Sequence, residues 1–239
     1  VAVSSDGSYQ TAINTSVIYC SSSYGSTFSG ITGSLITSDP STVLLSNCTT
    51  ALGNIQYVSG TNYTTNYFLY TSNYGSTWSY RTPSYYGTRM ACSASGQYVT
   101  FVNSSTNQIV VSSDYGLTWA IALTLTGVAL ISMSESGQYQ TCSKSTSADY
   151  VYTSSTFGNT WASQTGSSSI QRSDVKVSST GHYQTFVTNP GVSDYIYVSS
   201  DFGKAWTQIT MLGAKNWTAV ALSGSGQYQT AVDNVGNIY

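Results

Sequence analysis

One eight-residue segment recurs along the chain and constrains the fold more than any other feature. Its clearest copy is Ser-Ser-Asp-Tyr-Gly-Leu-Thr-Trp at residues 112–119. In this copy Asp114 can accept hydrogen bonds from backbone N–H groups of a turn, Gly116 can adopt a positive φ, and Trp119 can pack beneath. The segment is therefore predicted to be a structural turn that joins two strands.

Four other copies keep this pattern with drift. They are Ser-Ser-Ser-Tyr-Gly-Ser-Thr-Phe at 21–28, Thr-Ser-Asn-Tyr-Gly-Ser-Thr-Trp at 71–78, Ser-Ser-Thr-Phe-Gly-Asn-Thr-Trp at 154–161 and Ser-Ser-Asp-Phe-Gly-Lys-Ala-Trp at 199–206. The residues expected to stabilise the turns occupy the acid and tryptophan positions: Ser23, Asn73, Asp114, Thr156, Asp201, Trp78, Trp119, Trp161 and Trp206. The pattern resembles the Asp-box, or BNR repeat, of the sialidase-like β-propellers, and with its flanks the resemblance covers nearly the whole chain.

The flanks of the motif divide the chain into six repeats. Each repeat opens with a short apolar strand, and the openings lie near residues 1, 43, 90, 131, 175 and 220. These spacings are typical of a four-stranded propeller blade. A second strand follows a tight turn and carries Gly-x-Tyr-Gln-Thr or a close variant in every repeat except the second. We therefore predict an all-β chain, with residues 1–239 forming a single six-bladed β-propeller of four-stranded antiparallel blades with Asp-box turns.

The sixth repeat ends at Tyr239, before any Asp-box. We expect an incomplete sixth blade of three strands. A third strand at the edge would present unpaired backbone groups to another strand. Either residues beyond 239 or a strand of a neighbouring subunit is expected to complete the blade.

The composition limits the partners of the chain. Only 7% of the residues are charged, against about 25% in ordinary soluble domains. With seven Lys and Arg and a net charge of −2, no basic stripe can neutralise the phosphates of nucleic acid. No apolar run approaches the length that crosses a membrane. The charge-poor surface, rich in Tyr, Ser and Thr, indicates an extracellular setting or the surface of a cell or virion.

Cysteines and glycosylation motifs leave alternatives open. The four cysteines allow three complete disulfide pairings, or they can be buried free thiols: Cys20, Cys48, Cys92 and Cys142. Five Asn-x-Ser/Thr sequons are candidate glycosylation sites: Asn14, Asn47, Asn62, Asn103 and Asn216. In a chain so rich in Ser and Thr, this number is close to what chance gives, so it is not evidence that the sites are used.

Loop positions suggest where a ligand would bind. In a blade that meanders, the turns between strands 1 and 2 and the Asp-box turns lie on one face, which we call the Asp-box face. The other loops lie on the opposite face, where irregular sequence concentrates. Candidate glycan or protein contacts there belong to no repeat position, although an uninvolved loop is an equal alternative: Tyr63, Tyr67, Arg81, Tyr85, Tyr86 and Arg89. Packing between blades accounts better for the repeated tyrosines: Tyr9, Tyr98, Tyr139, Tyr183 and Tyr228.

Resemblance to sialidases would imply three arginines around a carboxylate, a Tyr–Glu pair and an aspartic acid. The chain has three arginines, Arg81, Arg89 and Arg172, and four aspartates are expected near the same face: Asp39, Asp149, Asp174 and Asp194. Against catalysis, the only glutamate, Glu135, is expected in a turn on the Asp-box face. His182 fills a turn position, and no cluster has metal-ligand spacing. We expect no enzyme activity, no cofactor and no metal.

These observations predict a non-catalytic β-propeller that is a structural subunit of a coat, fibre or filament. Its expected partners are other copies of itself or neighbouring surface proteins, and possible glycans. The alternative is a carbohydrate-binding, lectin-like module that uses the loops of the second blade. A sialidase-like glycoside hydrolase is the third hypothesis.

Overall fold

The computed structural model describes most of the chain: residues 1–31, 43–62, 66–81, 87–103, 105–144, 150–164, 172–188 and 193–239. These residues form β-strands and turns, with no helix among them, and accordingly no membrane-spanning helix is found in the described part. The chain divides into two compact units, residues 1–103 with 110–121, and residues 104–109 with 122–239.

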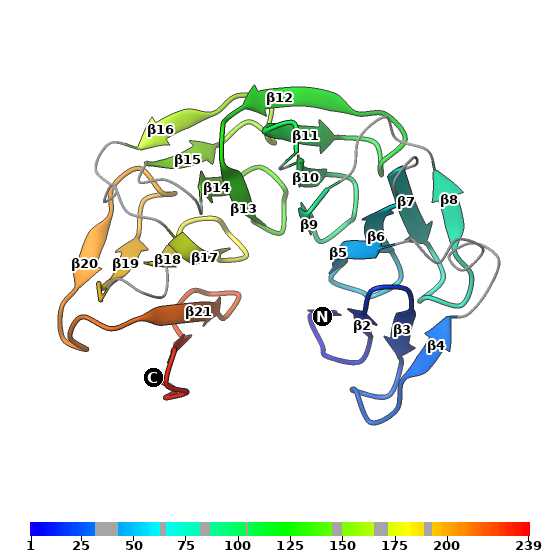
Figure 1. The fold of residues 1–239 in the computed structure, drawn as a ribbon, viewed down its shortest axis with the longest axis horizontal. Coiled ribbons are helices and arrows are strands. Elements are labelled where there is room, and N and C mark those ends of the chain that lie inside the picture. The colour runs from blue at the N-terminus through cyan, green and yellow to red at the C-terminus, as the bar shows by residue number, and fades with distance from the viewer. Residues whose placement is uncertain are drawn as a thin grey trace. The chain divides into compact units, whose positions relative to one another are not determined.

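The strands form six antiparallel sheets, here called blades 1 to 6, and within each sheet neighbouring strands follow one another in the chain (Figure 1). Blade 1 contains β1 (Ala2–Val3), β2 (Gln10–Ile13), β3 (Ile18–Ser21) and β4 (Ser29–Ile31). Blade 2 contains β5 (Val43–Thr49), β6 (Gln56–Thr61), β7 (Asn66–Thr71) and β8 (Ser79–Arg81). Blade 3 contains β9 (Arg89–Cys92), β10 (Val99–Asn103), β11 (Gln108–Ser112) and β12 (Ala120–Thr124).

The later blades repeat this order. Blade 4 contains β13 (Val128–Met133), β14 (Gln140–Lys144), β15 (Val151–Ser154) and β16 (Ala162–Gln164). Blade 5 contains β17 (Arg172–Val177), β18 (Gln184–Thr188), β19 (Ile196–Ser199) and β20 (Thr207–Ile209). Blade 6 contains β21 (Trp217–Leu222) and β22 (Gln229–Asp233).

Apolar side chains on facing sheets form the core of each unit. In the first unit Ile18 of blade 1 packs with Val58, Leu69 and Trp78 of blade 2. A second cluster joins blades 2 and 3 through residues such as Phe68 and Phe101, and in the second unit Val151 packs with Phe186. Strand residues alternate between the faces of a sheet, so each blade covers its neighbour on either side.

The first strand of blade 2 is longer than the repeat pattern predicts. Cys48 pairs with Tyr57 and Thr49 pairs with Gln56, the register that Ala2 and Val3 have with β2 in blade 1. The position of the opening strand is therefore filled from residue 47 rather than from residue 43. The apolar run at 43–45 misled the alignment because it is an extension of the same strand.

Blade 6 has fewer strands than predicted. Beyond β21 and β22, the chain adds a single bridge between Val232 and Ile238, supported by two backbone hydrogen bonds between Ala231 and Tyr239 of 3.1 and 2.9 Å. The sequence predicted a third strand here. Gly236, at φ 89°, turns the chain back here, and the N–H of Asp233 donates to the carbonyl of Asn237 at 3.2 Å.

The Asp-box turn and the turn between strands 1 and 2 lie together, as the meander predicts. In blade 3 the N–H of Tyr115 donates to the carbonyl of Gln97, at 3.0 Å. The same bond links Phe157 to Gln138 in blade 4, at 3.2 Å. Equivalent bonds occur in blades 1, 2 and 5, so each of blades 1 to 5 presents both turns on its Asp-box face.

The cysteines are free thiols, two of them buried and two half-buried. Cys48 and Cys142 are the buried pair, and burial raises the pKa of both thiols. Burial also raises the pKa of Cys20 to about 11. These side chains act as small apolar residues, which is the second of the two alternatives left by the sequence.

Candidate functional site

The Asp-box turn is held by its acid and by the serine two residues earlier. Asp114 Oδ1 accepts hydrogen bonds from the N–H groups of Leu117 and Thr118, at 3.1 and 2.8 Å. Its Oδ2 accepts the Thr118 hydroxyl at 2.6 Å, and Ser112 Oγ accepts the N–H of Gly116 at 2.9 Å. Asp201 makes the same contacts in blade 5, with N–H groups of Lys204 and Ala205. Both acids thus accept hydrogen bonds from backbone N–H groups of their own turns.

Hydroxyl and amide groups replace the acid in the other three turns. Thr156 Oγ1 accepts the N–H of Thr160 at 2.9 Å, Ser23 Oγ accepts that of Thr27 at 3.0 Å, and Asn73 Oδ1 that of Thr77 at 2.9 Å. A neutral oxygen makes a weaker bond than a carboxylate. The three turns without an acid are therefore held by weaker hydrogen bonds.

The aromatic residue before each Asp-box glycine also has a positive φ. Gly116 lies at φ 76°, as predicted, and Tyr115 lies at φ 60°. The same holds at the equivalent aromatic residues of the other turns: Tyr24, Tyr74, Phe157 and Phe202. Residues with a side chain rarely adopt this conformation, so it could not be predicted from the residue types.

Asp-box tryptophans close the turn from below. The indole N–H of Trp78 donates to the carbonyl of Gly75 at 3.1 Å, and those of Trp161 and Trp206 donate to the equivalent glycines at 2.7 and 2.9 Å. Trp119 packs edge-on against Phe68, with ring centroids 5.0 Å apart. The contacts of these four tryptophans are thus with their own turns or with a neighbouring blade.

Half of the ligand site predicted for blade 2 lies outside the described residues, namely Tyr63, Tyr85 and Tyr86. Of the remainder, Tyr67 packs against Tyr80, with ring centroids 5.6 Å apart, and its hydroxyl accepts a hydrogen bond from Asn62 at 2.7 Å. Arg89 is exposed and donates to the carbonyl of Thr88 at 3.2 Å.

Arg81 lies elsewhere than the prediction placed it. Its guanidinium lies 3.8 Å from the centre of the Tyr70 ring and donates to the carbonyl of Tyr115 at 2.6 Å. That carbonyl belongs to an Asp-box turn, so Arg81 supports the Asp-box face of its neighbouring blade. Arg81 and Tyr67 therefore contact different partners and do not form a common site in these contacts.

The groups that would serve a sialidase-like reaction have structural contacts. Arg172 is buried, and its guanidinium lies 4.6 Å from the centre of the Phe186 ring. Glu135 accepts the Ser179 hydroxyl at 2.6 Å in a turn on the Asp-box face. His182 packs edge-on against Phe202 at 5.1 Å. The buried Asp194 accepts the hydroxyl of Tyr197 at 3.3 Å, and Asp39 and Asp149 lie outside the described residues.

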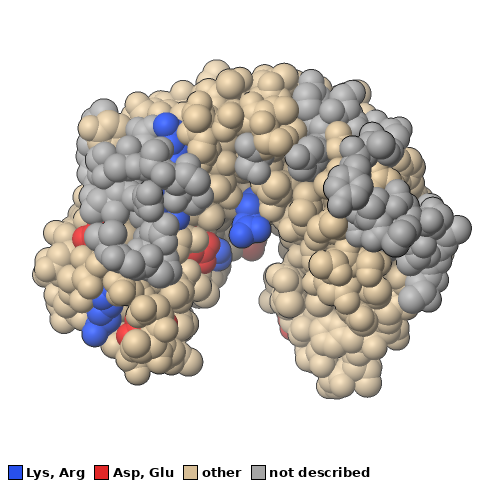
Figure 2. Space-filling view, viewed as in Figure 1, with Lys and Arg blue, Asp and Glu red and all other residues tan. Residues whose placement is uncertain are grey.

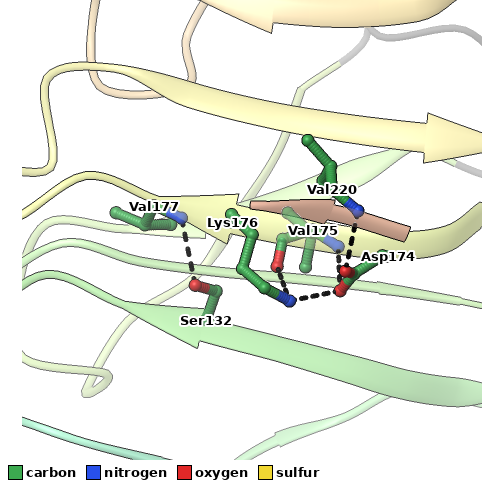
Figure 3. Close-up of polar contacts among 6 residues, drawn as sticks. All are labelled: Ser132, Asp174, Val175, Lys176, Val177 and Val220. Atoms are coloured by element: carbon green, nitrogen blue, oxygen red, sulfur yellow. Dashed lines mark hydrogen bonds and ion pairs between the residues drawn. The ribbon is translucent and has the colours of Figure 1, made fainter. Parts of the chain in front are cut away.

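Asp174 links the first strands of blades 5 and 6 (Figure 3). Its Oδ2 accepts the N–H of Val220 at 3.2 Å, and its Oδ1 accepts the N–H of Val175 at 2.9 Å and the ammonium of Lys176 at 2.5 Å. In the same view Ser132 Oγ accepts the N–H of Val177 at 3.0 Å, which joins blades 4 and 5. Polar side chains thus complete backbone bonding where neighbouring blades converge.

A groove lies between the outer strands of blade 4 and the Asp-box turn of blade 5, and we call it the blade 4–5 groove. Its volume is about 460 Å³. Aromatic rings, hydroxyls and amides line it: Gln138, Tyr139, Thr153, Ser154, Ser155, Thr160, Trp161, Ala162, Gln164, Phe202 and Lys204. Lys204 is the sole charged residue in this lining. Figure 2 likewise shows one face of the molecule on which charged atoms are few.

The sequence did not predict the blade 4–5 groove. Trp161 and Phe202 hold regular Asp-box positions, and Tyr139 holds the repeated tyrosine position. A repeat alignment assigns a structural role to such residues, and Trp161 does have one, because its indole N–H donates to the carbonyl of Gly158. The feature that distinguishes this groove is three-dimensional, because two turns and two outer strands must be brought together to form it.

Three of the five sequons have side chains engaged in the fold. Asn103 is 2% exposed, and the amide nitrogens of Asn47 and Asn62 donate to the Thr11 carbonyl and the Tyr67 hydroxyl, each at 2.7 Å. An attached sugar needs a free amide nitrogen, so these three are poor acceptors in the folded chain. Asn14 is exposed, and Asn62 and Asn216 are half-buried.

Comparison with known proteins supports the repeat and the fold. The family model of the BNR-Asp box repeat matches residues 196–209, so the predicted Asp-box resemblance is confirmed. No curated protein matches the chain. The solved GH74 enzyme of Niastella koreensis aligns with 96% of this chain and 40% of its own, at a TM-score of 0.77 and 16% identity.

Two further structures give the same fold. YCF48 bound to D1 peptide aligns over 99% of this chain and 74% of its own, at a TM-score of 0.70 and 15% identity. The GH74 xyloglucanase of Xanthomonas campestris aligns over 99% of this chain and 43% of its own, at a TM-score of 0.69 and 13% identity. The chain thus spans less than half of the GH74 enzymes that it resembles. The predicted all-β propeller fold is confirmed.

The prediction that the chain is not an enzyme is corrected by these similarities. It was based on missing sialidase residues, but two of the similar structures are GH74 glycoside hydrolases. The fold is therefore one that carries hydrolases of another kind. Absence of the sialidase pattern says nothing about such chemistry.

Proposed function

We propose that this chain is a carbohydrate-binding β-propeller and that a neutral glycan binds in the blade 4–5 groove. The observation that carries the proposal is the lining of the groove. Trp161, Tyr139 and Phe202 place aromatic rings beside hydroxyl and amide side chains. Aromatic faces stack on the apolar faces of sugar rings, and hydroxyls and amides pair with sugar hydroxyls.

The size and charge of the groove agree with such a ligand. Its volume of about 460 Å³ lies within the roughly 300–1,000 Å³ of small-molecule sites. Among the described residues that line the groove, Lys204 supplies one positive charge and none carries a carboxylate. A neutral or weakly acidic sugar chain matches this chemistry better than a phosphorylated ligand does.

The setting and the reaction remain part of the proposal. A surface with so few charges supports an extracellular location, or one on a cell or virion surface. Similarity to GH74 glycoside hydrolases supports a carbohydrate as the ligand class. Glycan binding is the proposed activity, and cleavage of the bound glycan is measured in the same experiment.

Calorimetric titration with a panel of neutral oligosaccharides and soluble polysaccharides tests the proposal. Wild-type protein should bind at least one of them, and Trp161→Phe should weaken that binding about tenfold, because the smaller ring loses part of the indole's stacking area and its N–H. Phenylalanine occupies the equivalent position 28 of this same chain, so the turn can accept it.

Trp206→Phe is the matched control. Trp206 makes the same indole bond, to the carbonyl of Gly203 at 2.9 Å, but it does not line the groove. It should leave glycan binding unchanged. Equal weakening in both variants, or no binding to any member of the panel, would contradict the proposal. New reducing ends in the same samples would add hydrolysis to binding.

A further inference from the structure

Two cysteines lie on neighbouring strands where blades 2 and 3 meet. Cys48 belongs to β5, the first strand of blade 2, and Cys92 belongs to β9, the first strand of blade 3. The two strands are in contact, and both side chains pack in the apolar cluster that contains Tyr57 and Met90. Both blades belong to the first compact unit, so this junction lies entirely within it.

The two strands are joined by hydrogen bonds before and after the cysteines. Ser46 Oγ accepts the N–H of Met90 at 2.9 Å, and the N–H of Ala51 donates to the carbonyl of Ala94 at 3.1 Å. Each cysteine follows its own strand's residue of the first bond by two positions. The strands therefore run in the same direction, with the two cysteines in register.

The equivalent junction of blades 4 and 5 shows how the first cysteine is oriented (Figure 3). Ser132 and Val177 hold the positions of Cys48 and Cys92 there, because each pairs with the corresponding residue of the second strand of its blade. Ser132 Oγ accepts the N–H of Val177 at 3.0 Å. By this equivalence the side chain of Cys48 points across the junction at Cys92.

The two thiols also affect the ionisation of neighbouring groups. Burial raises the pKa of the Cys48 thiol, and the Cys92 thiol, which is within hydrogen-bonding range, raises that pKa further. After burial, the same two cysteines contribute to the raised pKa of Tyr57, whose hydroxyl donates to the carbonyl of Gly96 at 2.9 Å. Both sulfur atoms therefore lie close to each other and to one buried phenol.

The four cysteines differ in their surroundings. Cys48 is 8% exposed, whereas Cys92 is half-buried, so a reagent in solution reaches Cys92 first. The thiol of Cys20 donates to Gln56 Oε1 at 3.8 Å. Cys142 lies in the second unit, and burial alone raises the pKa of its thiol.

We infer that Cys48 and Cys92 are a dithiol pair that a low-molecular-weight disulfide, such as oxidised glutathione, converts into a disulfide bond between blades 2 and 3. The structure shows the reduced form of the pair. Disulfides persist in oxidising compartments, and the proposed extracellular setting is one of these.

The bond forms by two thiol–disulfide exchanges. The Cys92 thiol loses its proton to solvent, and its sulfur attacks the reagent, which yields a mixed disulfide and one reagent thiol. The Cys48 thiol then loses its proton, and its sulfur attacks the Cys92 sulfur and displaces the second reagent thiol. Two protein thiols are thus oxidised, and one reagent disulfide is reduced to two thiols.

The new bond closes a loop of the chain that contains β6, β7 and β8 of blade 2. A disulfide stabilises a protein mainly because it restricts the unfolded chain. The unfolding equilibrium constant of the oxidised protein should therefore be roughly a hundredfold smaller than that of the reduced protein. A higher urea midpoint reports this difference.

Oxidation of the folded full chain with oxidised glutathione tests the inference. The remaining thiols are alkylated in urea, the chain is digested, and the peptides are identified by mass spectrometry without reduction. Wild-type protein should give one linked pair of peptides, joined through Cys48 and Cys92, and alkylated peptides for Cys20 and Cys142. Its urea midpoint should rise on oxidation.

Two variants use residues that the chain itself has at the equivalent positions. Cys48→Ser copies Ser132 and should end as a mixed disulfide of glutathione with Cys92. Cys92→Val copies Val177 and should leave Cys48 unmodified. Oxidised glutathione should raise the urea midpoint of neither variant. Cys20→Ser is the matched control, and it should form the linked peptides as fast as wild type does.

Each of three outcomes would overturn the inference. Four alkylated cysteines after treatment of the folded wild type would show that its thiols do not react as a pair. A wild-type chain that stops at the mixed disulfide on Cys92 would show that the two sulfur atoms cannot meet. Linkage through Cys20 or Cys142, or linkage that forms only in urea, would show pairing in the unfolded chain. Circular dichroism melting of each variant establishes that it is folded before it is compared.

Discussion

The aromatic residue of each Asp-box has a conformation that its own side chain disfavours. Tyr115 lies at φ 60°, and a residue other than glycine loses about 1 kcal/mol or more in this region. The hydrogen bonds of Asp114 and Ser112 offset that cost by fixing the backbone on the C-terminal side. The acid therefore stabilises a turn that is already strained, and it need not touch a ligand.

Removal of this acid should destabilise the chain moderately. We expect Asp114→Ala to lower the free energy of unfolding by about 1 kcal/mol, the typical worth of a helix-cap or turn bond. The loss is moderate because the N–H groups of Leu117 and Thr118 are exposed and water can replace the acid. Urea unfolding measures the change.

The opposite substitution can be made in the Asp-box turn of blade 4, where Thr156 occupies the position of the acid. Thr156→Asp should raise the free energy of unfolding by about 0.5 kcal/mol, since a carboxylate accepts more strongly than a hydroxyl. Unaltered unfolding in both variants would mean that the acid position does not stabilise the turn.

Acidification should weaken the turns that depend on carboxylates. Hydrogen bonds from Ser4 and then Ser8 lower the pKa of Asp6 from 3.8 to about 2. Because the folded pKa is lower than the unfolded one, the contribution of Asp6 is present above about pH 4 and is lost as pH falls through about 2. Burial raises the pKa of Asp114, but hydrogen bonds from Thr118 outweigh it and the pKa is lowered overall.

Melting curves at pH 7 and in this acidic window measure the effect. Asp6→Asn should lose less of its melting temperature on acidification than wild type does, because it has no proton to bind at that position. An equal loss in both proteins would show that other carboxylates account for the acid sensitivity.

At the scale of the strands, one motif joins the blades. The Gly-x-Tyr-Gln-Thr motif, here Gly-His-Tyr-Gln-Thr at residues 181–185, places a glutamine on one face of β18 and a threonine on the other, because neighbouring strand residues alternate. Gln184 accepts from the blade before and Thr185 donates to the blade after. The repeat is thus a connector in which each blade holds both of its neighbours within the unit.

A double-mutant cycle tests this connector. Thr141→Val should cost about 1–3 kcal/mol because it leaves Gln184 Oε1 buried without its donor. Combining it with Gln184→Leu should cost less than the sum of the single changes, with a coupling of about 1 kcal/mol. Strict additivity of the unfolding free energies would show that the bond seen between blades 4 and 5 contributes nothing.

Much of this organisation could be predicted from the sequence, because repetition reveals local geometry. The Asp-box, the alternating strands and the common face of the two turns all follow from residue types at fixed spacing. The first strand of blade 2 begins at Val43, but its alignment with the other opening strands was shifted because Val43 and Leu44 are as apolar as those strands. The positive φ of Tyr115 could not be predicted, since the tyrosine side chain itself argues against it.

The candidate site was less predictable for a physical reason. The blade 4–5 groove combines side chains from two blades that are individually regular, so no stretch of sequence marks it. Arg81 was expected to face a ligand, but its long side chain reaches the Tyr115 carbonyl in the neighbouring blade. Binding residues on a repeat scaffold become visible only when the scaffold is assembled.

For the whole molecule, the difference between interior and terminal blades has a measurable consequence. The strand β18 is bonded on both sides, whereas β22 has β21 on one side and a single bridge on the other. Amide hydrogens of β22 should therefore exchange faster than those of β18 at low protein concentration. Mass spectrometry of deuterated peptides resolves the two, and equal protection would mean that blade 6 is as well supported as blade 5.

The most direct test of the central claim, that this propeller binds carbohydrate, is a crystal structure of the chain with an oligosaccharide that it binds in solution. The account predicts a sugar ring in the blade 4–5 groove, against Trp161 or Phe202, with hydroxyl and amide side chains bonded to its hydroxyl groups. A sugar bound on the opposite face, beside Tyr67, would contradict the proposed site.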